Sequence, residues 1–468
     1  MSVKPMVWGT LLVLLLGSGP LRGQGPAWER AARLGKGMNL SWMEQYWEGS
    51  PDLRYADYLN WAKLDGLAED LELMQRLGVQ TLRLPVSFEY WAEEGAPHQL
   101  LRTDYFTAID SLLLWCERYD FNLVLDYQHG WLEDCSFGPS QQRLLALWQQ
   151  IAMRYRDSDP ERLFFELYNE PHTISAERWQ TVVEWLVAEL RPLVPKHTFI
   201  IGGVDYNSIR GLLQLQALSD PNIIYTFHFY EPFLFTHQGA NWAGRAVATT
   251  RIPFPYDRET MPPLSPRARG STGEKLYRWY RDDGQEHRIR EYLQVAKHWS
   301  LEQQRPIWCG EWGSHDRADR ESRCRYAAAL LQAFQELDMP HCYWEWDRNF
   351  SFFEWEVGWE YIPDCMMEAW ESTIPQTHPS MMAETDPLVI GNPFGEQLVV
   401  HFPQADRFER CIVYHSDGRL VGIYYLGGSS WTLDTQHWGV GTYLLRFENL
   451  TNAERTLLKV FKTVGGGE

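Results

Sequence analysis

The chain between residues 35 and 346 alternates between two patterns of apolar positions. One pattern is a short, almost continuous apolar run, which is typical of a strand buried on both faces. It occurs at residues 35–40, 79–88, 121–130, 162–171, 197–203, 222–230, 306–313 and 341–346. The other pattern spaces apolar residues three and four apart and predicts amphipathic helices. It occurs at residues 67–77, 107–119, 142–155, 176–193, 208–218, 286–299 and 324–337.

This alternation predicts an α/β fold. Continuously apolar strands joined by helices indicate a parallel sheet covered on its outer face. Eight such strands in one stretch of the chain predict a (β/α)8 TIM barrel, whose functional site lies at the carboxyl ends of the strands. An open, doubly wound sheet is the alternative, but the glycine-rich phosphate loop that usually follows its first strand is missing from the sequence.

The pattern changes near both ends of the chain. Residues 386–468 contain short alternating segments separated by Asp-Gly and Gly-Gly turns, which predict a small all-β sandwich. Residues 375–385 are the expected linker to a barrel domain at 24–374. The apolar run at 7–16 is too short for a membrane anchor. It predicts a signal peptide over 1–23, with a buried N-terminal helix as the alternative.

Composition narrows the classes of function. The formal net charge of −19 argues against nucleic acid and anionic membranes as partners, because both attract basic patches. The 23 tryptophans exceed what a core needs, so some rings are expected to line a cleft. Seven cysteines show no metal-binding spacing, so no structural zinc is expected. Sequence assigns no disulfide among them, and the odd number leaves at least one thiol unpaired within the chain.

Polar and ionisable residues gather where the predicted strands end. Burying such groups is unfavourable unless they are paired, so a functional cleft is expected at this rim. The residues are Arg83, His129, Asn169, Glu170, His228, Tyr230, Glu311 and Trp344.

Two of these residues point to a particular chemistry. Glu170 and Glu311 follow the fourth and seventh strands and are expected to face each other across the cleft. Two opposed carboxyl groups over an aromatic groove are what glycoside hydrolysis requires: one protonates the leaving oxygen and the other, ionised, attacks or stabilises the sugar cation. A structural ion pair between either glutamate and a rim arginine is the alternative.

At these residues the chain resembles glycoside hydrolase family 5, the group that includes many cellulases. The resemblance covers about residues 30–370 and rests on "LYNEPH" (167–172), "FHFYEPFLFTHQGANW" (227–242), "IWCGEWG" (307–313) and "YWEWD" (343–347). It implies that Glu170 is the general acid/base and Glu311 the nucleophile of a retaining mechanism. Arg83, His129, His228, Tyr230 and Trp344 match further family positions.

Physical roles follow for the residues around the two glutamates. Arg83 and Tyr230 can hold Glu311 ionised by charge and by hydrogen bonding. Asn169 can bond to the sugar 2-OH.

Other residues are expected to bind or orient. We expect His228 to orient Glu170, His129 to contact sugar hydroxyls and Trp344 to offer a flat face to the sugar. An insertion at 231–285 is long enough to be functional, and its Trp242 is a candidate sugar platform in a cleft wall.

The C-terminal segment carries a second resemblance. "NPFGEQLVVHF", "SDGRLVG" and "GVGTYLLRF" resemble the C-terminal sorting domain of the Bacteroidota type IX secretion system. This implies secretion machinery as a partner and a location outside the outer membrane, secreted or on the cell surface. A carbohydrate-binding or spacer module is the alternative.

The expected function is a retaining endo-β-1,4-glucanase acting on β-glucan polysaccharide or oligosaccharide. The alternatives are a β-mannanase or other hemicellulase of the same family, or a catalytically silent glycan-binding protein. Two carboxyl groups suffice for the reaction, so no metal and no organic cofactor is expected. The chain is expected to be a monomer.

Overall fold

The computed structural model describes residues 25–44, 65–92, 106–356 and 359–372 of the N-terminal part. In the C-terminal part it describes residues 388–390, 397–401, 408–415, 420–427, 430–449 and 455–462. The expected signal peptide (1–23) and the expected linker (375–385) lie outside these residues. Within the described ranges, no helix combines the length and the apolar character needed to cross a membrane.

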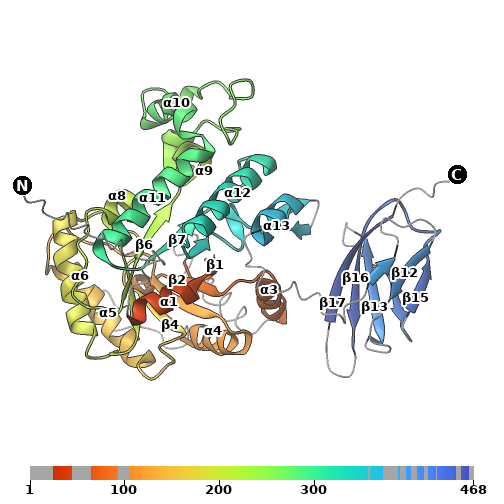
Figure 1. The fold of residues 1–468 in the computed structure, drawn as a ribbon, viewed down its shortest axis with the longest axis horizontal. Helices are drawn as coiled ribbons and strands as arrows, with labels where there is room; N and C mark the ends of the chain where they lie inside the picture. Colours follow the sequence, from red (N-terminus) through yellow and green to blue (C-terminus); the bar gives the residue numbers. More distant parts are fainter. Residues whose placement is uncertain are drawn as a thin grey trace, which may run out of the picture.

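Eight parallel strands form a closed barrel, as predicted (Figure 1). They are β1 (Lys36–Asn39), β2 (Thr81–Val86), β3 (Asn122–Tyr127), β4 (Leu163–Glu166), β5 (Thr198–Gly202), β6 (Ile223–Phe229), β7 (Ile307–Trp312) and β8 (His341–Tyr343). Strands β8 and β1 pair in parallel, with His341 opposite Lys36, and this closes the ring. All eight segments that the apolar runs indicated are strands of the barrel.

Helices surround the barrel and bury its outer face. Six of the seven predicted helices are present as α3 (Asp65–Arg76), α4 (Phe106–Tyr119), α5 (Pro139–Tyr155), α6 (Ala176–Leu190), α11 (Glu286–Gln303) and α12 (Arg320–Glu336). Leu, Ile, Val and aromatic side chains from these helices and from the strands form one large core cluster.

The predicted helix over 208–218 is wrong in length, because α8 covers only Ile209–Leu212. Beyond it, tertiary contacts use the backbone groups that a longer helix would bond internally. The Leu215 carbonyl accepts from the Trp299 indole at 3.3 Å, and the Leu218 amide donates to the Tyr225 hydroxyl at 2.7 Å. Local apolar spacing cannot reveal such competition.

The amino end of the barrel is closed by a helix that the apolar pattern did not predict. Helix α1 (Pro26–Leu34) crosses this end, in front of the strands in Figure 1. Its Ala27, Ala31 and Leu34 pack on an inward-facing apolar layer from six strands. That layer consists of Val124, Phe164, Ile200, Ile224, Trp308 and Cys342.

One step further along the strands the barrel interior becomes polar. Because side chains alternate along a strand, the residue two positions after each apolar one also faces inward. On β3 this takes Val124 to Asp126, and on β4 it takes Phe164 to Glu166. On β7 the same position is Gly310, where an added Cβ would lie 2.8 Å from the Thr226 hydroxyl oxygen. The barrel interior thus changes from an apolar layer to a charged layer within two residues along these strands.

Two further elements extend the barrel domain. Helix α13 (Asp364–Glu371) is joined to α12 by a disulfide between Cys324 and Cys365. The insertion at 231–285 contains α9 (Phe233–Thr236), the 3-10 helices η2 (Asn241–Val247) and η3 (Pro266–Ala268), and α10 (Thr272–Asp283). Figure 1 shows α10 standing out from the ring of helices.

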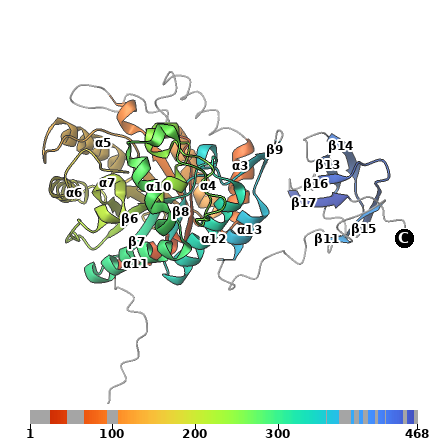
Figure 2. The ribbon, with the colours of Figure 1, turned by 90° about the horizontal axis from the view of Figure 1, so that it is seen from above.

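The C-terminal part consists of two antiparallel sheets (Figures 1 and 2). Its strands are β11 (Leu388–Ile390), β12 (Gln397–His401), β13 (Arg410–His415), β14 (Leu420–Tyr425), β15 (Ser430–Asp434), β16 (Gly441–Glu448) and β17 (Arg455–Lys462). One sheet has the order β11-β12-β15 and the other β14-β13-β16-β17. Leu398 of the first sheet and Val413 and Leu445 of the second share one buried cluster. This is the all-β sandwich expected from the turns.

Candidate active site

Arg83 on β2 lies at the centre of the polar layer and is fully buried. Its Nε and Nη2 donate to the two carboxylate oxygens of Glu166 at 2.7 and 3.0 Å. Nη2 also donates to Asn169 Oδ1 at 2.8 Å and lies 3.2 Å from Asp126 Oδ2. Three acidic groups, Glu311 included, thus surround one guanidinium, and their charges hold the pKa of Arg83 well above its usual range despite burial.

Glu311 at the end of β7 is bound on both carboxylate oxygens. Arg83 Nη1 donates to Oε1 at 2.8 Å, and the Tyr230 hydroxyl donates to Oε2 at 2.8 Å. The side chain is almost fully buried. Burial and the neighbouring Glu311 charge raise the pKa of Tyr230 well above its usual range, so this hydroxyl stays a donor at neutral pH.

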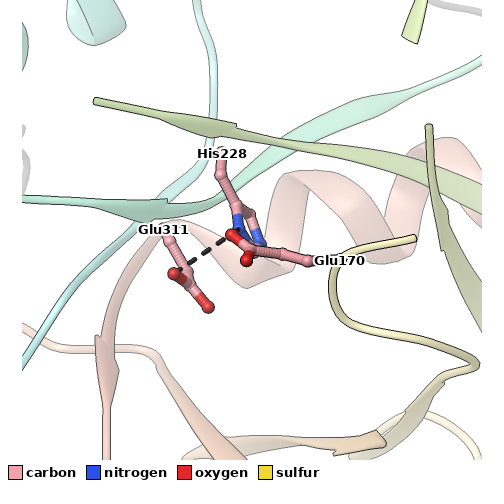
Figure 3. A group of neighbouring side chains, drawn as sticks. All are labelled: Glu170, His228 and Glu311. Atoms are coloured by element: carbon pink, nitrogen blue, oxygen red, sulfur yellow. Dashed lines mark hydrogen bonds and ion pairs between the residues drawn. The ribbon is translucent and has the colours of Figure 1, made fainter. Parts of the chain in front are cut away.

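Glu170 follows β4 and faces Glu311 through His228 (Figure 3). His228 Nδ1 lies 2.7 Å from Glu170 Oε1 and 3.4 Å from Glu311 Oε2. One carboxylate oxygen from each glutamate and one ring nitrogen of His228 lie within 4.8 Å of one another. Strand pairing sets this approach, since His228 stands opposite Glu311 just after a register shift between β6 and β7.

The two carboxyl groups share a raised affinity for protons. Burial raises the pKa of Glu170 to about 7, against the lowering charges of Arg83 and two histidines. Burial also raises the pKa of Glu311 to about 7, assisted by the Glu170 charge. Only Glu311 receives direct donors from both Arg83 and Tyr230. Between the two titration steps, therefore, the remaining proton resides mainly on Glu170.

The histidine between the carboxyl groups is neutral at physiological pH. Burial lowers the pKa of His228 to about 4. A neutral ring can accept a hydrogen bond from protonated Glu170 or donate one to the ionised form. His228 can therefore orient Glu170 in both protonation states.

A cavity of about 540 Å³ opens over this network. Side chains from the strand ends and from the insertion line it. They include Glu44, Gln128, His129, Tyr168, Asn169, Glu170, His172, Tyr230, His237, Trp242, Glu311, Trp344, Glu345, Arg348, Asn349 and Phe350. Seven of the nine residues predicted from the sequence thus line this cavity. The other two lie beneath it: His228 contacts Glu170, and Arg83 donates to Glu311 and Asn169.

The predicted sugar-contacting residues occupy different positions in the wall. Trp344 is half-buried beside the two glutamates. His129 Nε2 lies 3.4 Å from Glu44 Oε1. Trp242, on η2, leaves 61% of its surface exposed and stacks on His315 with ring centroids 5.3 Å apart. The insertion therefore forms a cleft wall, as expected from its length.

Sequence reasoning missed the acidic residues that surround Arg83. Asp126 and Glu166 stand opposite each other in the β3–β4 register, and Asn39 stands opposite Arg83 in the β1–β2 register. Asn39 Oδ1 accepts from Arg83 Nη1 at 3.0 Å. A signal was available, because an ionisable residue inside an apolar strand needs a buried partner.

Glu170, His228 and Glu311 are also residue types that bind metals. Their contacts argue for a different use here. His228 Nδ1, the ring nitrogen nearest both glutamates, already lies 2.7 Å from Glu170 Oε1, and the oxygens of Glu311 accept from Arg83 and Tyr230. A cation would also be repelled by the adjacent guanidinium. The donor set therefore fits proton transfer better than metal binding.

A larger hollow, of about 1090 Å³, lies at the opposite end of the barrel around α1. Its charged side chains pair with one another, as Arg191 does with Asp220 at 2.6 Å and Arg30 does with Glu161. These charged side chains form ion pairs with each other. The candidate catalytic groups are therefore those at the carboxyl ends of the strands.

Comparison with known proteins identifies the family of the chain. Residues 36–350 match the family model Cellulase (glycosyl hydrolase family 5). This match covers more than half of the chain, so the chain belongs to glycosyl hydrolase family 5 and is a glycosyl hydrolase of the cellulase type.

Two curated relatives carry endoglucanase names. Endoglucanase 3 of Fibrobacter succinogenes is 30% identical over 307 residues, which cover 61% of this chain and 46% of that protein. Endoglucanase C of Acetivibrio thermocellus is 28% identical over 297 residues, covering 60% of this chain and 83% of that protein.

A solved structure shows the same barrel. The endoglucanase Cel5A from the hyperthermophilic Thermotoga maritima is 25% identical, with a TM-score of 0.57 over 73% of this chain and 98% of that one. Other structures of that protein are complexes with cellobiose or with mannotriose.

The buried charge of Arg83 yields a stability prediction. Replacing it in Arg83→Met leaves Asp126, Glu166 and Glu311 without their countercharge, so the free energy of unfolding of the barrel should fall by about 3–5 kcal/mol at pH 7. At pH 4 the deficit should narrow, because burial raises the pKa of Glu311 to about 7, and the protonated Glu311 needs no cation. Urea denaturation followed by tryptophan fluorescence at both pH values measures this.

Arg83→Lys is the matched control for that prediction. It keeps the positive charge but loses the two-pronged bond to Glu166, so its loss of stability should be smaller. Equal stability of Arg83→Met and the wild type at pH 7, or a deficit that widens at pH 4, would contradict the account.

Proposed function

We propose that this chain is a retaining endo-β-1,4-glucanase that cleaves β-glucan by double displacement. The observation that carries the proposal is the approach of Glu170 and Glu311 within 4.8 Å through oxygens facing one cavity. Retaining glycosidases hold their two carboxyl groups about 5–5.5 Å apart, whereas inverting enzymes need about 6.5–9.5 Å to admit a water.

In the first step Glu311 attacks the anomeric carbon while the bond to the leaving oxygen breaks. Glu170 gives its proton to that oxygen, so the leaving sugar departs neutral and a glycosyl ester forms on Glu311. In the second step Glu170, now ionised, takes a proton from water as the water attacks the same carbon. The ester bond breaks and Glu311 returns as a carboxylate.

The surrounding residues support these steps. Arg83 and Tyr230 favour the ionised Glu311 before attack and as the leaving group in the second step. Asn169 uses its side-chain oxygen to accept from Arg83, so its amide NH2 is free to donate to the 2-OH. Trp344 and Trp242 offer ring faces to the glycan, and His129 reaches its hydroxyls.

Relatives favour β-glucan as the substrate class. Several of them carry endoglucanase names, and the Thermotoga maritima protein has been solved in complex with cellobiose. That protein's mannotriose complex makes β-mannan the second candidate for this chain. A silent glycan-binding role is less favoured, because a binder has no need of a buried pair of carboxyls with raised pKa.

We assign the C-terminal sandwich to export rather than to catalysis. The family match ends at residue 350, before the sandwich begins. Together with the resemblance of its segments to type IX sorting domains, this supports a sorting function and a location outside the outer membrane.

Substitution of each glutamate tests the proposed chemistry. On carboxymethyl-cellulose and mixed-linkage β-glucan, Glu170→Gln and Glu311→Gln should each reduce reducing-sugar release to background. With an aryl β-cellobioside, whose leaving group needs no acid, azide should restore turnover of Glu170→Ala and give the β-azide. Activity of either Gln variant at the wild-type rate would exclude the assigned roles.

The pH profile tests which carboxyl keeps the proton. The active form has Glu311 ionised and Glu170 protonated, so kcat/KM should rise as Glu311 loses its proton and fall as Glu170 loses its own. Because burial raises the pKa of both groups to about 7, the alkaline limb should lie near or above neutrality. In Glu170→Ala, with the aryl β-cellobioside, that alkaline limb should disappear while the acidic limb remains.

Export is tested by shortening the chain. In a Bacteroidota host, the full chain should be recovered from the medium or the cell surface, whereas a chain ending at residue 374 should stay in the periplasm. Enzyme activity in lysates checks that the shortened chain is folded. Equal export of both chains would rule out a sorting role for the sandwich.

A further inference from the structure

The main chain leaves the barrel sheet just before Glu170. Strand β4 ends at Glu166, and the Asn169 amide still donates to the Tyr127 carbonyl at 3.1 Å. Pro171, the residue after Glu170, has no amide hydrogen to donate. Pairing with a neighbouring strand therefore fixes the main chain ahead of Glu170, and a different kind of contact is needed after it.

His172 supplies such a contact. Its Nδ1 lies 2.7 Å from the Glu170 carbonyl oxygen. Because a carbonyl oxygen can only accept, this ring nitrogen carries the proton and donates. His228 Nδ1 lies 2.7 Å from Glu170 Oε1, at the other end of the same residue. Two imidazoles thus hold Glu170, one at its main chain and one at its carboxyl group.

The His172 ring is itself held by a stacked tyrosine. His172 lies exposed at the cavity, and Tyr206 leaves 58% of its surface exposed. Their rings nevertheless stack, with centroids 4.5 Å apart and planes at 7°. An exposed side chain changes rotamer readily unless a neighbour restrains it. The stack therefore restricts the orientation in which the imidazole meets the Glu170 carbonyl.

The turn that presents Tyr206 has an uncommon backbone. Three consecutive residues lie in the left-handed region, since Asp205, Tyr206 and Asn207 have φ of +60°, +59° and +53°. Bulky side chains are disfavoured there, and such conformations persist where surrounding contacts hold them. Asn207 Oδ1 accepts from the Gly203 amide at 3.1 Å and fixes the turn after β5. The turn in this way keeps the tyrosine ring against the imidazole.

We propose that His172 and Tyr206 are positioning residues for proton transfer from Glu170 to the leaving oxygen. This inference rests on the proposed function, in which Glu170 is the general acid. Neither residue gives or takes a proton in the reaction. Tyr206 holds the imidazole, and the imidazole holds the Glu170 carbonyl, so the carboxyl group stays where the leaving oxygen lies. A displacement of about 1 Å is enough to slow such a step strongly.

A sugar platform is the other use of an exposed tyrosine near a cleft. Tyr206 does not itself line the cavity, whereas His172 does. The imidazole also covers one face of the tyrosine ring. The influence of Tyr206 on the site therefore passes through His172, which favours the positioning role.

Two aryl β-cellobiosides separate proton transfer from the other steps. A phenyl leaving group needs a proton from Glu170, whereas a dinitrophenyl leaving group departs without one. Tyr206→Gly removes the ring and leaves a residue that accepts the left-handed backbone. Its kcat/KM should fall on the order of tenfold on the phenyl substrate. On the dinitrophenyl substrate it should equal the wild-type value, which also shows that the variant is folded.

Substitutions of His172 separate the hydrogen bond from the stack. His172→Phe keeps a ring against Tyr206 but loses the donor, so it should show the same phenyl-specific loss. His172→Asn keeps an N–H group at the same number of bonds from Cα and should recover part of the rate. Tyr206→Phe keeps the stack and should behave as the wild type.

Phe137→Ala is the matched control. Phe137 is 55% exposed, its ring contacts Trp185 with centroids 5.4 Å apart, and it does not line the cavity. Loss of this exposed ring should leave kcat/KM on both cellobiosides unchanged. A phenyl-specific loss in Phe137→Ala would show that the effect is not particular to Tyr206 and would contradict the assignment.

The possible results separate this inference from the proposed function. Glu170→Ala is the reference, with a large loss on the phenyl substrate and a small one on the dinitrophenyl substrate. Equal losses of Tyr206→Gly on both substrates, or none, would overturn the positioning role and leave the hydrolase intact. A loss on polymer alone would replace that role by direct sugar contact. A wild-type chain inactive on every substrate would overturn the proposed function, and the positioning role with it.

Discussion

The charge balance around Arg83 is the constraint on which the site depends. One guanidinium is fully buried inside a barrel whose adjacent layer is apolar, and it is tolerated because Glu166, Asp126 and Glu311 surround it. The same cation that satisfies the structural acids Glu166 and Asp126 also lowers the cost of ionising Glu311. Stability of the barrel and ionisation of Glu311 are therefore two effects of one interaction.

The unequal contacts of Glu170 and Glu311 determine which of the two carboxyl groups keeps a shared proton. Both glutamates lie in a desolvating environment that favours their neutral forms, yet only Glu311 has a guanidinium and a phenol directly on its oxygens. Glu170 has a neutral imidazole instead. Two identical side chains thus have different hydrogen-bond partners because they stand on different strands. The same division of labour between two carboxyls is general for glycosidases.

Much of this arrangement could be predicted from the sequence because it follows from periodicity. Apolar runs marked all eight barrel strands, and the polar residues that end those runs converge on one cavity since parallel strands end at the same rim. Asn39, Asp126 and Glu166 were missed because they stand inside the apolar runs, where strand register decides their partners. Helix α8 is shorter than the apolar spacing predicted, because Trp299 and Tyr225, which are distant in sequence, bond to the backbone of the residues that follow it.

Helix α1 limits the side of the barrel from which a ligand can reach the site. The barrel axis is filled by side chains such as Phe164 and Trp308, and α1 covers the amino end of that filling. In the described part of the barrel this layer leaves no passage along the axis, so under the proposed function glycan, attacking water and both fragments use the same face. A fragment that has not yet departed therefore occupies the place that the next stretch of polymer needs. Under the proposed function, competition between fragment and polymer for this one face is a consequence of the filled barrel axis.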